Sequence, residues 1–140
     1  MDDMGHWIST QAVPENVYGF VYCITNLVCN RMYVGKKQML TLKKRPPLKG
    51  KKRKRVEIVD TDWRTYTSSS VELNADIEKH GKHNFKFEIL RYCDSKSALA
   101  YYEAKEQFDR EVLLREEYYN GIINLRIGKI KGITKISQKS

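Results

Sequence analysis

Two short stretches with the alternation of β-strands, joined by a turn, constrain the fold of this chain more than any other feature. From Tyr18 to Ile24, bulky residues alternate with smaller ones, which is the period-two pattern of a strand. The segment Asn26–Asn30 predicts a turn, because asparagine tolerates the bent backbone that turns require. Met32–Val34 resumes the strand pattern, and Gly35 is expected to end it. The sequence therefore predicts a β-hairpin here.

Each predicted strand of this hairpin carries a tyrosine near its middle. Tyr22 and Tyr33 are eleven residues apart, so the two side chains are expected to meet across the hairpin. For either tyrosine taken alone, filling a sheet is the simpler interpretation, because aromatic residues are common in strands.

The next predicted elements are a helix and a third strand. Ser69 and Glu72 have the spacing of a capping box, in which the two side chains satisfy free amides at a helix start. Gly81 is a typical helix stop. The clean alternation of Phe85–Ile89 then predicts a strand.

A second, longer helix is predicted from a cap at Asp94 or Ser95 to about Glu117. Its expected buried stripe has three-and-four spacing and consists of Ala98, Tyr101, Lys105, Phe108 and Val112. Together these elements predict a small α+β domain with a three-stranded antiparallel sheet flanked by helices.

Composition and length favour one intracellular domain. The chain has 140 residues, of which 41% are hydrophobic, and it contains no apolar run of about 18 residues or more that would predict a membrane helix. An acidic start and three unpaired cysteines favour a soluble, cytoplasmic protein without a disulfide framework. Cys23 and Cys93 lie inside predicted strands and are expected to be small buried hydrophobic residues. The histidines lack zinc-ligand spacing, so no structural zinc is expected.

The net charge of +9 predicts a polyanion as partner, and DNA is the preferred one. Between Lys43 and Arg55 there are nine Lys or Arg residues and no acid. Pro46, Pro47 and Gly50 exclude a continuous helix, so a mobile loop that clamps DNA phosphates is expected; a solvated loop or a localisation signal is the alternative. The expected DNA-binding residues are Lys36, Lys37, Lys44, Arg45, Lys49, Lys51, Lys52, Arg53, Lys54, Arg55 and Arg64. No membrane and no small-molecule substrate are expected, and the sequence leaves the oligomeric state open.

The chain is expected to divide into three parts. Residues 1–16 form an N-terminal arm in which Trp7 and Ile8 pack back on the domain. Residues 17–127 form the domain itself, with the basic insertion at about 43–55, and residues 128–140 form a basic tail.

Several motifs, taken in order, resemble the GIY-YIG nucleases, and in particular the phage homing endonucleases of that family. The hairpin ends in Tyr33-Val34-Gly35, although Gly19 lies one position earlier than the family pattern has it. Three further segments follow in the family's order: Ser68–Gly81 with Phe85–Leu90, Tyr101–Lys105, and Tyr118–Asn120. The resemblance covers about residues 17–125.

This resemblance implies a DNA endonuclease or nickase that uses one divalent metal ion, Mg²⁺ or Mn²⁺. Glu103 would be the metal ligand. Tyr22, alone or with Tyr33, would help to activate the attacking water, and nearby positive charge would have to lower its pKa. Asn120 would support the site through hydrogen bonds, with Asn124 as the alternative match.

Two assignments stay open within the resemblance. A helical wheel places Glu106 nearer the expected apolar stripe than Glu103, so spacing alone does not choose between them. Lys43 occupies the position of the family's phosphate-binding arginine on a helix, and its rivals are Lys37, Lys44, Arg45 and Arg64. A non-catalytic nucleic-acid-binding module that retains the fold is the alternative function, and a structural RNA-binding protein is a third.

Overall fold

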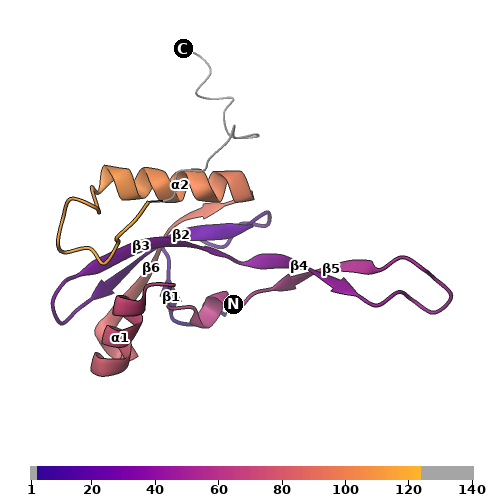
Figure 1. Ribbon diagram of the computed structural model, residues 1–140, viewed down its shortest axis with the longest axis horizontal. Coiled ribbons are helices and arrows are strands. Elements are labelled where there is room, and N and C mark those ends of the chain that lie inside the picture. Colours follow the sequence, from indigo (N-terminus) through magenta and orange to yellow (C-terminus); the bar gives the residue numbers. More distant parts are fainter. Residues whose placement is uncertain (1–2, 124–140) are drawn as a thin grey trace, which may run out of the picture.

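In the computed structural model, which describes residues 3–123, strand β2 (Gly19–Asn26) is the centre of a four-stranded sheet (Figure 1). The strand order is β1–β6–β2–β3, where β1 is Trp7–Ile8, β6 is Phe85–Cys93 and β3 is Met32–Gln38. β2 pairs antiparallel with β3 and β6, and β1 pairs parallel with β6. The α+β class is confirmed, and the sheet adds one parallel strand, β1, to the three predicted antiparallel strands.

The alternation along β2 divides the buried residues between the two faces of the sheet. Phe20, Tyr22 and Ile24 belong to one hydrophobic cluster, whereas Val21 and Cys23 belong to another. Helix α1 contributes to the first cluster and helix α2 to the second, and the two helices lie on opposite sides of the sheet (Figure 1). Both Cys23 and Cys93 are buried, as predicted.

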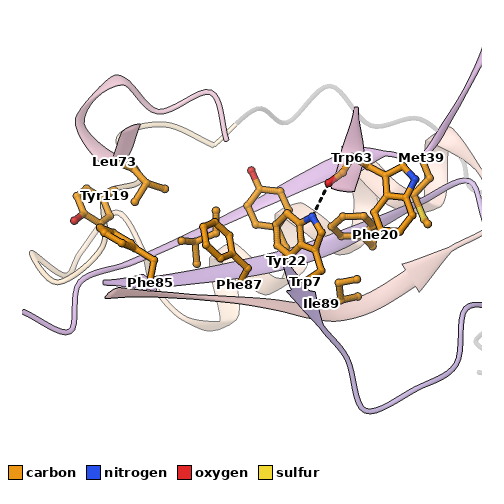
Figure 2. Packing of buried hydrophobic residues seen from close by; sticks show 11 residues of the cluster. Trp7, Phe20, Tyr22, Met39, Trp63, Leu73, Phe85, Phe87, Ile89 and Tyr119 are labelled. Atoms are coloured by element: carbon orange, nitrogen blue, oxygen red, sulfur yellow. Dashed lines mark hydrogen bonds between the residues drawn. The ribbon is translucent and has the colours of Figure 1, made fainter. Parts of the chain in front are cut away.

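Trp7 anchors the N-terminal segment to the first cluster, as the sequence predicts, whereas Ile8, which was expected to pack with it, is exposed. Its ring lies 4.9 Å from Phe20 and 5.0 Å from Tyr22 between centroids. Its Nε1 donates a hydrogen bond of 2.6 Å to the carbonyl oxygen of Trp63 (Figure 2). Because a buried indole N–H requires an acceptor, this bond fixes the position of β1 relative to the short 3₁₀ helix η1 (Trp63–Thr65).

Helix α1 (Val71–His80) begins one residue later than the capping box predicts. Ser70 is the cap, and its hydroxyl accepts from the amide of Leu73. Glu72, which was expected to complete the box, forms an ion pair with Arg31 at 2.7 Å instead. Gly81 ends the helix with a φ of 90°, as predicted, and the 3₁₀ helix η2 (Lys82–Asn84) leads into β6.

Helix α2 (Lys96–Asp109) is capped by Ser95 and ends well before Glu117. Glu111 has a φ of 56°, which takes the chain out of helical geometry. The predicted stripe is wrong at Tyr101, Lys105 and Phe108, which are exposed, whereas Ala98 and Val112 are buried as predicted. The buried side chains of the helix are Ala98, Leu99, Ala104 and Gln107. The buried face of the helix thus consists of two alanines, a leucine and a glutamine, so the spacing of its large aromatic residues does not indicate that face.

Gly35 does not end the hairpin strand, because β3 continues to Gln38. The chain then forms a separate two-stranded antiparallel sheet, β4 (Leu40–Arg45) and β5 (Arg55–Asp60), which projects from the body (Figure 1). The basic run, predicted to be a loop, therefore contributes strand residues at both ends, and only its middle, residues 46–54, connects the two strands. Among the described residues, no helix is long and apolar enough to cross a membrane.

We predict that the burial of His6 makes the free energy of unfolding decrease at acidic pH. Its ring stacks on Phe87 at 3.9 Å, its Nε2 donates to the carbonyl oxygen of Tyr66, and its Nδ1 is buried without a partner. Burial, with a smaller effect of Lys82, lowers the pKa of His6 from 6.5 to about 4. The unfolded chain therefore takes up the proton first, and the free energy of unfolding decreases as pH falls from about 6.5 to about 4.

Urea denaturation across this pH range tests the prediction. His6→Gln should show a smaller acid-side loss of stability than the wild type, whereas the exposed-histidine control His83→Gln should follow the wild type. Parallel curves for wild type and His6→Gln would contradict it.

Candidate active site

A cavity of about 230 Å³ lies at the outer edge of β3 and brings together residues from five separate segments. It is lined by Tyr22, Tyr33, Lys36, Tyr66, Ser69, Glu103, Gln107 and Ile122. Three of the predicted catalytic residues, Tyr22, Tyr33 and Glu103, are thus in one place. Lys36 joins them as a cation.

Gly35 allows Tyr22 to reach this cavity. The two residues are direct partners in the β2–β3 register. A Cβ added at Gly35 would lie 2.5 Å from the Tyr22 hydroxyl and 2.9 Å from the Tyr33 ring. The Tyr22 ring therefore lies across β3 in space that only glycine leaves open.

Tyr22 and Tyr33 are neutral phenols. Tyr22 lies 6.2 Å from Tyr33 and 6.3 Å from Tyr66 between ring centroids. Burial raises the pKa of Tyr22 well above its ordinary value, and Tyr33, Tyr66 and Glu103 raise it further. Burial also raises the pKa of Tyr33, partly offset by a hydrogen bond with Ser69. The expectation that nearby positive charge lowers the pKa of Tyr22 is wrong, since burial and acidic neighbours dominate.

The geometry distinguishes Glu103 from Glu106. The Glu103 side chain is 17% exposed, lines the cavity and lies 3.5 Å from the Nζ of Lys36. Burial raises the pKa of Glu103, and Lys36 opposes that shift. Glu106 instead pairs with Arg110 at 2.6 Å. The helical wheel favours Glu106 only if the large aromatic residues of α2 form its buried face, and they are exposed.

Asn120 and Gln107 hold the edge of β3 beside the cavity. The side chain of Asn120 accepts from the amide of Val34 at 3.0 Å and donates to its carbonyl oxygen at 2.8 Å. Gln107 donates to the same carbonyl oxygen at 2.9 Å. These bonds satisfy both backbone groups of Val34, as a neighbouring strand would. Hydrogen-bonding support of this kind is what the resemblance implies for Asn120. Asn124, the alternative, lies outside the described residues.

Lys43 does not join the site. It lies on β4, paired with Glu57, in the projecting sheet (Figure 1). The helix expected to carry a phosphate-binding cation at this position is replaced by a strand, because the chain continues from β3 directly into β4. Lys36 and Lys37 lie nearer the cavity than Lys43 does. Lys36 lines it. Lys37 pairs with Asp62 at 2.8 Å, and its Nζ lies 4.2 Å from the centre of the Tyr66 ring.

The other expected DNA-binding residues are divided between two places. Arg64 stacks on Trp63 and donates to the carbonyl oxygen of Asp3, so it supports the N-terminal segment. The backbone of Lys44 and the side chains of Arg45 and Arg55 belong to the β4–β5 pair, where Arg45 contacts Glu57. The basic residues of the connecting loop, all of them exposed, are Lys49, Lys51, Lys52, Arg53 and Lys54. The basic tail expected at 128–140 lies outside the described residues.

Sequence reasoning missed Tyr66, Ser69 and Gln107 as cavity residues. Tyr66 and Ser69 come from the irregular segment between η1 and α1, where no periodicity indicates an orientation. Gln107 lies four residues after Glu103 and therefore on the same face of α2. That spacing was the available signal.

Comparison with known protein families gives one match. The family model described as "Putative endonuclease segE, GIY-YIG domain" matches residues 5–123. No curated protein and no solved structure matches the chain. The matched range includes β1 and every residue of the cavity.

We predict that Gly35→Ala destabilises the domain by about 1–3 kcal/mol, the usual cost of overpacking a closed space. The added methyl group would meet the buried Tyr22 ring, which has little room to move. Gly121→Ala is the matched control, because a Cβ there meets nothing within 4 Å. Denaturant unfolding of both variants checks the prediction, and equal stabilities would refute the close contact.

Proposed function

The chain belongs to the GIY-YIG endonuclease family, and from that premise we propose that it is a metal-dependent nuclease that hydrolyses phosphodiester bonds in DNA. One observation carries the proposal: Tyr22, Tyr33, Lys36 and Glu103 converge on one cavity from β2, β3 and α2. Phosphoryl chemistry needs groups that bind the charged phosphate and groups that position water, and this cavity contains both kinds.

The donor set of the cavity fits Mg²⁺ or Mn²⁺ held mainly by substrate and water. Glu103 is the carboxylate that lines the cavity. Within residues 3–123, no cluster of three or more His, Cys, Asp or Glu side chains is placed to enclose a metal ion. Mg²⁺ retains several waters and commonly takes one or two protein carboxylates together with phosphate oxygens, so Glu103 suffices as the protein ligand. The bound ion would polarise the scissile phosphate and stabilise the leaving oxygen.

Lys36 is the cation that we assign to the phosphate in place of Lys43. Its Nζ already lies beside the Glu103 carboxylate, so a phosphate at that carboxylate would come within its reach. Lysine contributes a point charge rather than the two-pronged contact of arginine. Lys37 lies over the Tyr66 ring and pairs with Asp62, outside the lining of the cavity.

The tyrosines contribute hydrogen bonds as neutral phenols. Because their pKa values are raised, Tyr22 and Tyr33 keep their protons at neutral pH in the free protein. In the proposal each hydroxyl donates to a phosphate oxygen or orients the attacking water. Asn120 and Gln107 act indirectly, since they fix the strand that carries Tyr33.

The proposal extends to a homing-type enzyme, because the motifs resemble phage homing endonucleases. Such an enzyme would act on duplex DNA with a preferred target. The position of Lys43 away from the cavity favours a second candidate, a nucleic-acid-binding module that retains the fold without cutting.

Plasmid nicking separates these candidates. We expect the wild type to cut supercoiled DNA with Mg²⁺ and not with chelator. Glu103→Gln should reduce cutting by about 100-fold or more, because the carboxylate that binds the metal is removed. Tyr22→Phe should reduce it by about 100-fold while DNA binding is retained.

Glu106→Gln is the matched control on the same helix and should cut at close to the wild-type rate, since its partner Arg110 lies outside the cavity lining. Equal reductions in Glu103→Gln and Glu106→Gln would reject the assigned ligand. Binding by the wild type without cutting, over several metals and substrates, would favour the binding module.

A further inference from the structure

Most of the chain's net charge lies on one projecting element. We call residues 40–60, which form β4, β5 and their connecting loop, the β4–β5 arm. The arm contains nine Lys or Arg and two Asp or Glu residues, a net charge of +7 out of +9 for the chain. The other 119 residues together carry only +2. Five further Lys or Arg residues lie in residues 124–140 without an acid, so positive charge is concentrated in the arm and in this C-terminal segment rather than in the rest of the chain.

The base of the arm is fixed to the strand that forms the active site. Met39, between β3 and β4, is buried, and its amide donates to the carbonyl oxygen of Tyr18 at 2.8 Å. The amide of Thr61 donates to the carbonyl oxygen of Met39 at 2.9 Å, and its hydroxyl donates to the carbonyl oxygen of Gln38 at 2.6 Å. Both strands are thus anchored where they leave the body, so the arm has a set direction relative to the cavity.

The two faces of the arm differ in chemistry. Residues opposite one another in the register share a face. One face pairs Lys43 with Glu57 and Arg45 with Arg55. The other contains Leu42 opposite Ile58, and Val56 opposite Lys44. These three apolar side chains are 69%, 66% and 60% exposed, respectively.

Charge complementarity identifies the partner that would cover this apolar face. A second copy of the chain would bring another arm with a net charge of +7 against the first. DNA would bring negative charge to the loop lysines and, in its major groove, the methyl groups of thymine for apolar side chains. If the charged face of the arm pointed to the floor of the groove, the side chains of Leu42, Val56 and Ile58 would remain exposed to water in the complex.

Resting on the proposed function, we propose that the β4–β5 arm is a sequence-reading element that enters the major groove of duplex DNA. The major groove, about 12 Å wide, admits a two-stranded ribbon. Leu42, Val56 and Ile58 would face the base edges, and the loop lysines would contact the flanking phosphates. Six strand residues span about 20 Å, roughly half a helical turn, so the bases read would lie several base pairs from the cut.

Selection from randomised DNA duplexes in chelator tests the apolar face without cutting. We expect the wild type to enrich a motif, and the double variant Leu42→Thr with Ile58→Thr to lower that preference about fivefold or more. Threonine retains strand propensity, so the arm should persist. Leu114→Thr, which changes an exposed leucine elsewhere, is the matched control and should enrich the wild-type motif.

The loop is tested by the salt dependence of binding. Replacing residues 46–54 with Asn-Gly closes the same Arg45–Arg55 pair with a tight turn and removes five positive charges. The negative slope of log affinity against log salt should become shallower, by about 0.9 for each phosphate that the shortened arm no longer neutralises. Lys79→Gln with Lys82→Gln removes charge from the body and should leave the slope nearly unchanged.

The outcomes separate this inference from the proposed function. The arm inference alone would be overturned if the wild type nicks DNA but selects no motif. It would also be overturned if the double variant Leu42→Thr with Ile58→Thr enriches the wild-type motif as strongly as the wild type does. A changed oligomeric state in the Leu42→Thr and Ile58→Thr variant, with selection intact, would instead assign the face to contacts between copies. Wild-type protein that neither binds nor nicks duplex DNA would reject the proposed function itself.

Discussion

The close contact of the Tyr22 ring with Gly35 is the constraint on which the site depends. Pairing of β2 with β3 brings these residues opposite each other, and the missing side chain at Gly35 lets a large ring lie across an edge strand. The Tyr22 side chain, from the central strand, thereby reaches the edge of the sheet, where it lines the same cavity as Glu103 of α2. A site at the edge of a sheet usually has exposed, mobile side chains, but here Tyr22 is set by the core itself.

The same edge needs protection, because β3 would otherwise expose unpaired backbone groups. The segment after α2 supplies this by running beside β3: the amide of Met32 donates to Glu117, its carbonyl oxygen accepts from Tyr119, and Asn120 with Gln107 completes the pairing at Val34. The edge is thus covered up to the cavity. The side chains of Asn120 and Gln107 therefore support both this edge and the strand that carries Tyr33.

The parts of the fold that follow from local alternation were predictable: the three antiparallel strands, the tyrosine pair, the helix stop at Gly81 and the packing of Trp7. The face of α2 was not, because it buries small and polar side chains and exposes Tyr101 and Phe108. Lys43 was misplaced for a different reason. Its role was transferred from a family helix, whereas the chain forms a strand here. Tyr66 lies on an irregular segment, and its proximity to Tyr22 depends on tertiary contacts that no local pattern encodes.

The parallel pairing of β1 with β6 also has a consequence for synthesis of the chain. Trp7 is paired with Phe87, and Gly19 with Cys93, so the sheet cannot close until most of the domain has left the ribosome. Among the described strands, only the β2–β3 hairpin and the β4–β5 pair can form from neighbouring segments alone. Glu103 leaves the ribosome after all of these strands. A nascent chain therefore lacks the assembled cavity until the domain is nearly complete.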